Sequence, residues 1–227
     1  MTADFPVVFA LYPRITQLDF TGPFEVLARL PGARCVLASV EGGTIQADGG
    51  ITFAGVVRLA DVAECALLCV PGGFGTVAAL ENQPYLAQLR RLGAQAQFIT
   101  SVCTGSLLLA AAGLLRGKKA ACHWAWRELL SEFAVMPDAA RVVRDGNVIT
   151  GGGVTAGIDY ARTVQLALEY APEPPFDSGR PERARPEIVA AAQKRLDVIR
   201  AERAAAVHRA AELLAKRVCE TSPALES

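Results

Sequence analysis

The chain has 227 residues, of which 52% are hydrophobic and 20% are charged. This composition is typical of one globular domain, or of a domain with an appendage, and it excludes an intrinsically disordered chain. Lysine and arginine together number 23, and aspartate and glutamate also number 23, so the formal net charge is +0. Because no basic run breaks this balance, we expect no nucleic-acid partner.

Short apolar runs alternate with longer helical stretches along the chain. This alternation predicts an α/β fold with a mostly parallel sheet and helices on both faces. The expected strands span residues 7–11, 35–39, 66–70, 98–102, 119–122 and 147–150, and residues 44–53 form a hairpin. The first helix is expected to open near Thr21, with Thr21 as its cap and Pro23 in its first turn. Two further helices are expected over residues 104–112 and 155–171.

The composition changes at Pro172, where a stretch rich in proline and charge begins. Apolar residues then recur at steps of three, four or eight from Ile188 to Val218, which predicts an amphipathic helix. We therefore expect an α/β domain over residues 1–171. Residues 172–227 are expected to form a connection and a helix that packs on the domain or on a second subunit.

The six cysteines have no spacing typical of a disulfide framework, and no C-x-x-C pair occurs. The chain has two histidines, so we expect no metal site. Residues 1–14 lack a basic segment, and their apolar stretch is interrupted by Pro13 and Arg14. We expect neither a signal peptide nor a membrane span there, and hence a cytoplasmic protein with no membrane partner.

Cys103 stands apart from the other cysteines because it follows an apolar strand and is followed by small residues and a helix. A sharp strand-to-helix turn of this kind lifts its central side chain above the carboxyl edge of a sheet. The helix N-terminus is expected to favour the thiolate over the thiol. We interpret Cys103 as a nucleophile and expect Cys35, Cys65, Cys69 and Cys122 to be core residues.

Around Cys103 the sequence reads Ser-Val-Cys-Thr-Gly-Ser over residues 101–106. With Pro-Gly-Gly-Phe-Gly at residues 71–75 and Leu-Asp-Phe-Thr-Gly-Pro at residues 18–23, it resembles the DJ-1/PfpI superfamily, and within it the isocyanide (isonitrile) hydratases. This resemblance implies a flavodoxin-like three-layer sandwich, a homodimer, and an enzyme without a cofactor. The implied reaction converts an isonitrile and water into an N-substituted formamide.

In this superfamily an acidic residue at the position of Asp19 contacts the nucleophile, and the resemblance carries that role to Asp19. A carboxylate beside a thiolate would repel it, so we expect the two groups to share a proton. Cys103 would attack the terminal carbon of the isonitrile while Asp19 delivers the proton, and the product would be a covalent thioimidate.

Backbone N–H groups of Gly72, Gly73 and Thr104 are expected to form a pocket like an oxyanion hole beside the sulfur. Other residues are expected at the edge or in the lining of the substrate pocket: Phe24, Phe74, His123, Trp124 and Gly152.

Two other functions remain open on the sequence alone. One is a DJ-1-like glyoxalase that acts on α-oxoaldehydes with His123 as the proton carrier. The other is a thiol-based redox or ligand-sensing domain without catalysis, since an accessible cysteine of low pKa oxidises readily. The same turn occurs in domains fused to AraC-type DNA-binding modules, but we expect nothing after Val218 to supply such a module.

Overall fold

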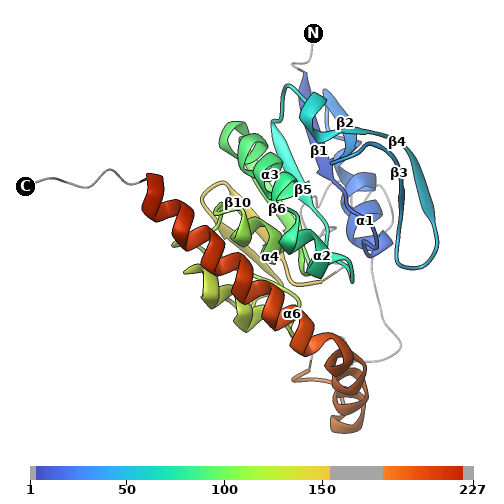
Figure 1. Cartoon of the computed structure of the whole chain (residues 1–227). Coiled ribbons are helices and arrows are strands. Elements are labelled where there is room, and N and C mark those ends of the chain that lie inside the picture. Colours follow the sequence, from blue (N-terminus) through green and yellow to red (C-terminus); the bar gives the residue numbers. More distant parts are fainter. Residues whose placement is uncertain (1–3, 154–180, 222–227) are drawn as a thin grey trace, which may run out of the picture.

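The computed structural model describes residues 4–153 and 181–221 and contains an eight-stranded sheet (Figure 1). The strand order is β3-β4-β2-β1-β5-β6-β10-β9. The pairs inside this order are parallel, and only the two outermost pairs, β3 with β4 and β9 with β10, are antiparallel. The strands are β1 (Phe5–Ala10), β2 (Ala33–Ser39), β3 (Gly43–Gln46), β4 (Thr52–Arg58), β5 (Leu67–Val70), β6 (Phe98–Val102), β9 (Val142–Asp145) and β10 (Val148–Gly151).

Helices cover both faces of this sheet. Helix α1 lies on one face, and α2, α3 and α4 lie on the other (Figure 1). The helical elements are α1 (Gln17–Leu27), η1 (Leu59–Asp61), α2 (Thr76–Glu81), α3 (Gln83–Gln95), α4 (Gly105–Ala111), η2 (Arg127–Phe133) and α6 (Pro186–Thr221). A two-stranded sheet of β7 (Lys119–Ala120) and β8 (Met136–Pro137) completes the described fold. The predicted α/β sandwich with a mostly parallel sheet is confirmed.

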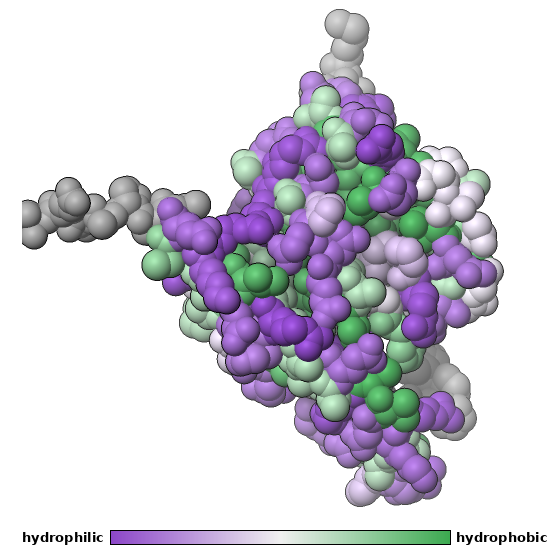
Figure 2. All heavy atoms as spheres, in the orientation of Figure 1, coloured by the Kyte–Doolittle hydropathy of each residue, from purple (hydrophilic) through white to green (hydrophobic). Residues whose placement is uncertain are grey.

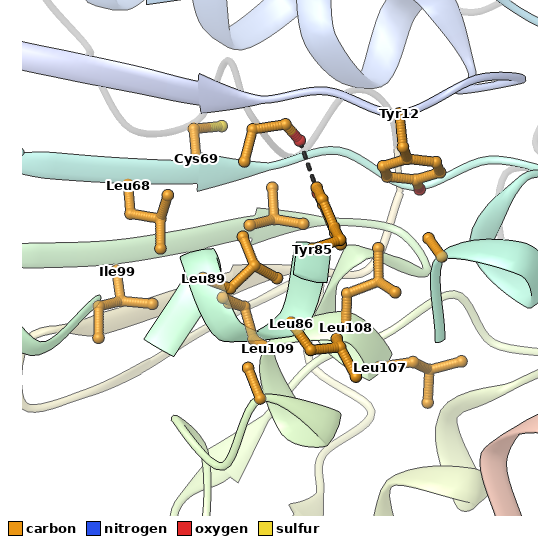
Figure 3. Packing of buried hydrophobic residues seen from close by; sticks show 14 of the residues in the cluster. Tyr12, Leu68, Cys69, Tyr85, Leu86, Leu89, Ile99, Leu107, Leu108 and Leu109 are labelled. Carbon is orange, nitrogen blue, oxygen red and sulfur yellow. Dashed lines mark hydrogen bonds between the residues drawn. The ribbon is translucent and has the colours of Figure 1, made fainter. Parts of the chain in front are cut away.

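Apolar packing on both faces holds the central strands in place. On the α1 face, the rings of Phe9, Phe20 and Phe24 pack with centroids 5.3 to 5.5 Å apart. On the opposite face, leucines of α3 and α4 pack beneath β5 and β6 (Figure 3). There the buried Tyr85 hydroxyl donates to the Ala10 carbonyl at 2.8 Å, at the end of β1. The carboxyl ends of β1, β5 and β6 are therefore fixed side by side at one edge of the sheet.

The first helix begins earlier than the sequence predicted. Helix α1 begins at Gln17, with Thr16 as its N-cap residue, and the Thr21 hydroxyl donates to the Gln17 carbonyl inside the helix. Pro23 also lies inside the helix, so it does not mark the first turn. The earlier start buries Phe20 against the sheet, a gain that outweighs the local preference for Pro in the first turn. Asp19 consequently lies in the first turn of α1.

Helix α6 packs against α2, α4 and η2 (Figure 1). Its buried residues are confined to the middle of the helix: Arg203, Ala206, Val207 and Ala210. The outward side of α6 is largely hydrophilic, as expected of an amphipathic helix (Figure 2). None of the helices in the described ranges is long and apolar enough to cross a membrane.

Several strand boundaries agree with those expected from the sequence: residues 98–102 match β6, and the hairpin corresponds to β3 and β4. The expected strand over residues 119–122 is shorter, since β7 contains two residues. The sequence analysis did not predict α2, α3 or β9. The helix expected over residues 155–171 and the domain boundary at residue 171 lie outside the described residues.

Candidate active site

Cys103 occupies a strained turn between β6 and α4. Its φ angle is 56°, in the left-handed region that residues with a side chain rarely adopt. Its N–H donates to the Gly151 carbonyl at 2.8 Å, and its carbonyl accepts the His123 N–H at 3.3 Å. The turn also needs Gly105, because a Cβ atom there would lie 2.1 Å from the Val70 carbonyl oxygen. These contacts set the Cys103 side chain at the carboxyl edge of the sheet, partly exposed.

Asp19 reaches the same edge from α1. The Thr16 N–H donates to the Gly72 carbonyl at 2.9 Å, which ties the start of α1 to the loop after β5. A Cβ atom at Gly72 would lie 2.8 Å from Asp19 Oδ2 and 2.6 Å from the Thr104 nitrogen. Asp19 is fully buried. The carboxyl group and the residue after the nucleophile therefore meet across Gly72.

The carboxyl group of Asp19 has an unusual affinity for its proton. Burial raises the pKa of Asp19 from 3.8 to about 7, although the Cys103 thiol and the Gly72 N–H both act to lower it. Neither carboxyl oxygen forms a hydrogen bond of regular geometry with the described residues. Near neutral pH, Asp19 is thus poised between its protonated and ionised forms.

The surroundings of Cys103 favour the thiol over the thiolate, opposite to the effect expected from the helix N-terminus alone. Burial raises the pKa of Cys103 well above its usual value, and the negative charge of Asp19 raises it further. The Thr104 N–H at the start of α4 acts in the opposite direction. Helix α4 has only seven residues, so its dipole does not outweigh desolvation.

Hydroxyl groups stabilise the loop beside the sulfur. The Gly73 N–H donates to Thr104 Oγ1 at 3.0 Å, and Thr76 Oγ1 lies 2.8 Å from Thr104 Oγ1. The Tyr12 hydroxyl donates to the Pro71 carbonyl at 2.8 Å and lies 3.2 Å from Thr76 Oγ1. Sequence reasoning missed Tyr12 and Thr76, which follow β1 and begin α2 without a motif that marks them.

The Gly73 N–H, expected as a donor beside the sulfur, is already bound to the Thr104 hydroxyl. The Gly72 N–H acts on Asp19, and the Thr104 N–H acts on Cys103. Of the three expected donors, Thr104 is therefore the one whose N–H meets the sulfur.

A cavity of about 200 Å³ opens beside Cys103. Its lining combines the strand-to-helix turn at Cys103 (the elbow), the loop after β5, the segment around η2 and helix α6. The lining residues are Thr16, Gly73, Phe74, Cys103, Thr104, His123, Trp126, Leu196, Ile199 and Arg203. Phe74 and His123, which were expected at the pocket, belong to this lining.

Three residues expected at the pocket are not part of that lining among the described residues. Phe24 packs in the core with Phe9 and Phe20. Trp124 packs beside the His123 ring, and the indole that faces the cavity is that of Trp126. The Gly152 N–H donates to the Arg141 carbonyl at 2.8 Å.

His123 is poorly suited to carry a proton at neutral pH. Burial lowers the pKa of His123 to about 4, and the positive charge of Arg203 lowers it further. Its Nδ1 atom accepts the Ala125 N–H at 3.3 Å. A neutral imidazole of this kind weakens the glyoxalase interpretation, which required His123 as an acid and base.

Arg203 is a site residue that the sequence analysis missed. It lies on α6 with 2% of its surface exposed, its Nη2 donates to the Gly73 carbonyl at 3.1 Å, and its guanidinium lies 4.5 Å from the Trp126 ring centroid. The sequence contained a signal for this residue, because the apolar positions of the helix leave a gap between Ile199 and Val207. Arg203 occupies the middle of that gap, on the face that packs against the domain.

A larger cavity of about 590 Å³ lies on the other side of Phe74, between the start of β3, α2 and α6. Its lining does not include Cys103. We therefore assign the chemistry to the smaller cavity. Within residues 4–153 and 181–221, no group of three or more histidine, cysteine, aspartate or glutamate side chains is arranged to hold a metal ion.

Comparison with known proteins gives consistent matches. The sequence profile of the DJ-1/PfpI family matches residues 6–166. The chain is 45% identical over 200 residues to an isonitrile hydratase of Pseudomonas putida, covering 82% of this chain and 88% of that protein. It is 31% identical to the transcriptional regulator CdhR of Pseudomonas aeruginosa, of which it spans 52%.

Among solved structures, a ThiJ/PfpI family protein from Pseudomonas syringae superimposes with a TM-score of 0.85 at 36% identity. That match covers 92% of this chain and 91% of the other. A family profile over most of the chain, a close sequence relative and a matching fold agree with the elbow at Cys103. The chain belongs to the DJ-1/PfpI family.

Proposed function

We propose that this protein is an isonitrile hydratase, a hydro-lyase that adds water to R–N≡C and releases the N-substituted formamide. The observation that carries the proposal is the buried Asp19 carboxyl, with a pKa of about 7, facing the Cys103 thiol at the edge of the sheet. The 45% identity to the isonitrile hydratase of Pseudomonas putida supports the same reaction.

The first step starts from the Asp19 and Cys103 pair in the form in which the two side chains share a single proton. Cys103 attacks the terminal carbon of the isonitrile as the thiolate, and Asp19 delivers the shared proton to that same carbon. A carbon–sulfur bond and a carbon–hydrogen bond form, and the carbon–nitrogen triple bond becomes a double bond. The product is a thioimidate on Cys103, and Asp19 is left ionised.

The second step hydrates this intermediate. Ionised Asp19 takes a proton from water while the oxygen adds to the thioimidate carbon, and the proton passes to the nitrogen. The carbon–sulfur bond then breaks, the hydroxyl proton returns to the Asp19 and Cys103 pair, and the formamide leaves. In this proposal the Thr104 N–H stabilises the sulfur as negative charge returns to it.

Replacement of the nucleophile tests the proposal. Cys103→Ala and Cys103→Ser are expected to lower formamide production from cyclohexyl isocyanide at least about 1,000-fold, since loss of a nucleophile removes the covalent route. Cys219→Ser is the matched control, because Cys219 is exposed at the end of α6. Intact-mass spectrometry of the wild type with excess isonitrile is expected to detect the adduct on Cys103. Full activity in Cys103→Ala would overturn the proposal.

We also propose a homodimer, an α/β domain over residues 1–171 with the remaining residues as its appendage, and a cytoplasmic location. Family membership supports the dimer, and the absence of disulfide-type cysteine spacing supports a reducing compartment. Light scattering after size exclusion is expected to give about twice the chain mass of 24.0 kDa. A mass equal to one chain would contradict the dimer.

A further inference from the structure

Arg203 brings a buried positive charge to the cavity beside the nucleophile. Only 2% of its surface is exposed, and its Nε has no hydrogen-bond partner among the described residues. Its Nη2 donates to the Gly73 carbonyl. A buried charge is costly unless it is paired, so an arginine kept here without an ion pair calls for a binding partner.

No carboxylate of the described residues forms an ion pair with Arg203. The neighbouring Glu202 lines the larger cavity, and Glu132 is within 3.6 Å of His208. Asp19 is not part of the lining of the cavity that Arg203 faces. The stacking of the guanidinium on Trp126 stabilises its position and leaves its charge unpaired.

The other lining residues indicate the chemistry of the ligand that the cavity would accept. Phe74, Trp126, Leu196 and Ile199 are apolar, so the cavity suits a small organic group with one anionic end. Its volume of about 200 Å³ suits a small ligand. A guanidinium presents N–H groups in a planar fork that matches a carboxylate.

We propose that the substrate is a small isonitrile that carries a carboxylate, and that Arg203 binds the carboxylate while the isonitrile carbon faces Cys103. This inference rests on the proposed function, since it names the substrate class of the same site. It assigns the appended helix α6 a direct part in substrate selection. The natural substrate is then a small isonitrile acid.

The test compares isocyanoacetate with its neutral isostere isocyanoacetamide. In the wild type we expect kcat/KM to be about 10- to 100-fold higher for isocyanoacetate, as for one charge-assisted pair. Arg203→Met is expected to lower the ratio of the two kcat/KM values by the same factor, and Arg203→Lys to restore part of it. Arg200→Met is the matched control, because Arg200 lies one turn away with its centre 5.6 Å from the Trp126 ring, and pairs with Asp197.

Wild-type protein alone gives a second measurement that does not depend on how the variants fold. N-formylglycine, the product from isocyanoacetate, is expected to inhibit hydration of isocyanoacetamide at least about 10-fold more strongly than N-formylglycinamide does. Equal rates for the two isonitriles in the wild type, or an unchanged ratio in folded Arg203→Met, overturn the inference and leave the hydratase proposal intact. If the wild type hydrates none of isocyanoacetate, isocyanoacetamide and cyclohexyl isocyanide, the hydratase proposal itself is overturned.

Discussion

The two sides of the Cys103 site are built from different parts of the chain. On one side, β1, β5 and β6 end together and bring Asp19, Gly72 and Thr104 to the sulfur. On the other side, helix α6 supplies Arg203, and the segment before η2 supplies Trp126. The sheet side holds a proton, and the helix side holds a fixed positive charge.

This difference assigns the reaction to one side of the site and the choice of substrate to the other. In the proposed mechanism, groups on the sheet side act on the sulfur and the proton, which every isonitrile needs alike. In the proposed binding mode, groups on the helix side face the part of the substrate that differs from one isonitrile to another. Substitutions on the sheet side are therefore expected to slow all substrates together, and the Arg203 substitutions to change the ratio between them.

Among the groups around the sulfur, the largest effect is expected from Asp19→Asn. An amide cannot exchange the proton that forms the carbon–hydrogen bond, so kcat is expected to fall about 100- to 10,000-fold. Isocyanoacetate and isocyanoacetamide are expected to lose rate by the same factor. Asp48→Asn is the matched control, because Asp48 lies at the surface, where it forms an ion pair with Arg14. A loss confined to isocyanoacetate would place Asp19 in substrate binding.

Gly72→Ala tests how tightly the sheet side is packed. The added methyl would lie 2.8 Å from Asp19 Oδ2 and 2.6 Å from the Thr104 nitrogen, so one of them must move. We expect a loss of about 1–3 kcal/mol in the free energy of unfolding, measured with urea, and a rate about 10- to 100-fold lower. Gly49→Ala is the control, since its methyl would meet nothing within 4 Å. Equal effects in both variants would contradict the close approach.

The pH dependence of kcat/KM gives the smallest and most specific effect. Below the pKa of Asp19, about 7, both groups of the pair are protonated and no thiolate is available. Raising the pH removes one proton and creates the reactive form, so kcat/KM is expected to rise about tenfold per unit up to pH 7 and then level off. Asp19→Asn is expected to abolish this rise. A rate that falls between pH 5.5 and 7 would contradict the shared-proton mechanism.

Much of the sheet side could be predicted from the sequence because its signals are local. An apolar strand that runs into Cys103 and small residues specifies the elbow, and the glycines at 72 and 73 mark the facing loop. The state of the sulfur could not be predicted in this way. Its pKa depends on burial by elements distant in the sequence, and this burial outweighs the effect of the short helix α4.

The helix side was largely hidden in the sequence. The contacts of Arg203 with Gly73 and Trp126 span 130 and 77 positions, and nothing near Arg203 specifies these partners. Trp124 was expected at the pocket and Trp126 lines it, because the chain turns between them before η2. The gap in the apolar stripe of α6 identifies Arg203 as an exception but not the cavity that it faces.

The left-handed backbone at Cys103 has a consequence for evolution and engineering. A φ of 56° costs a cysteine on the order of 1 kcal/mol that glycine would not incur. Selection for thermal stability alone would therefore favour glycine at position 103, and that substitution removes the reactive sulfur. A cysteine at this position therefore gives up backbone stability in exchange for a reactive sulfur at the edge of the sheet.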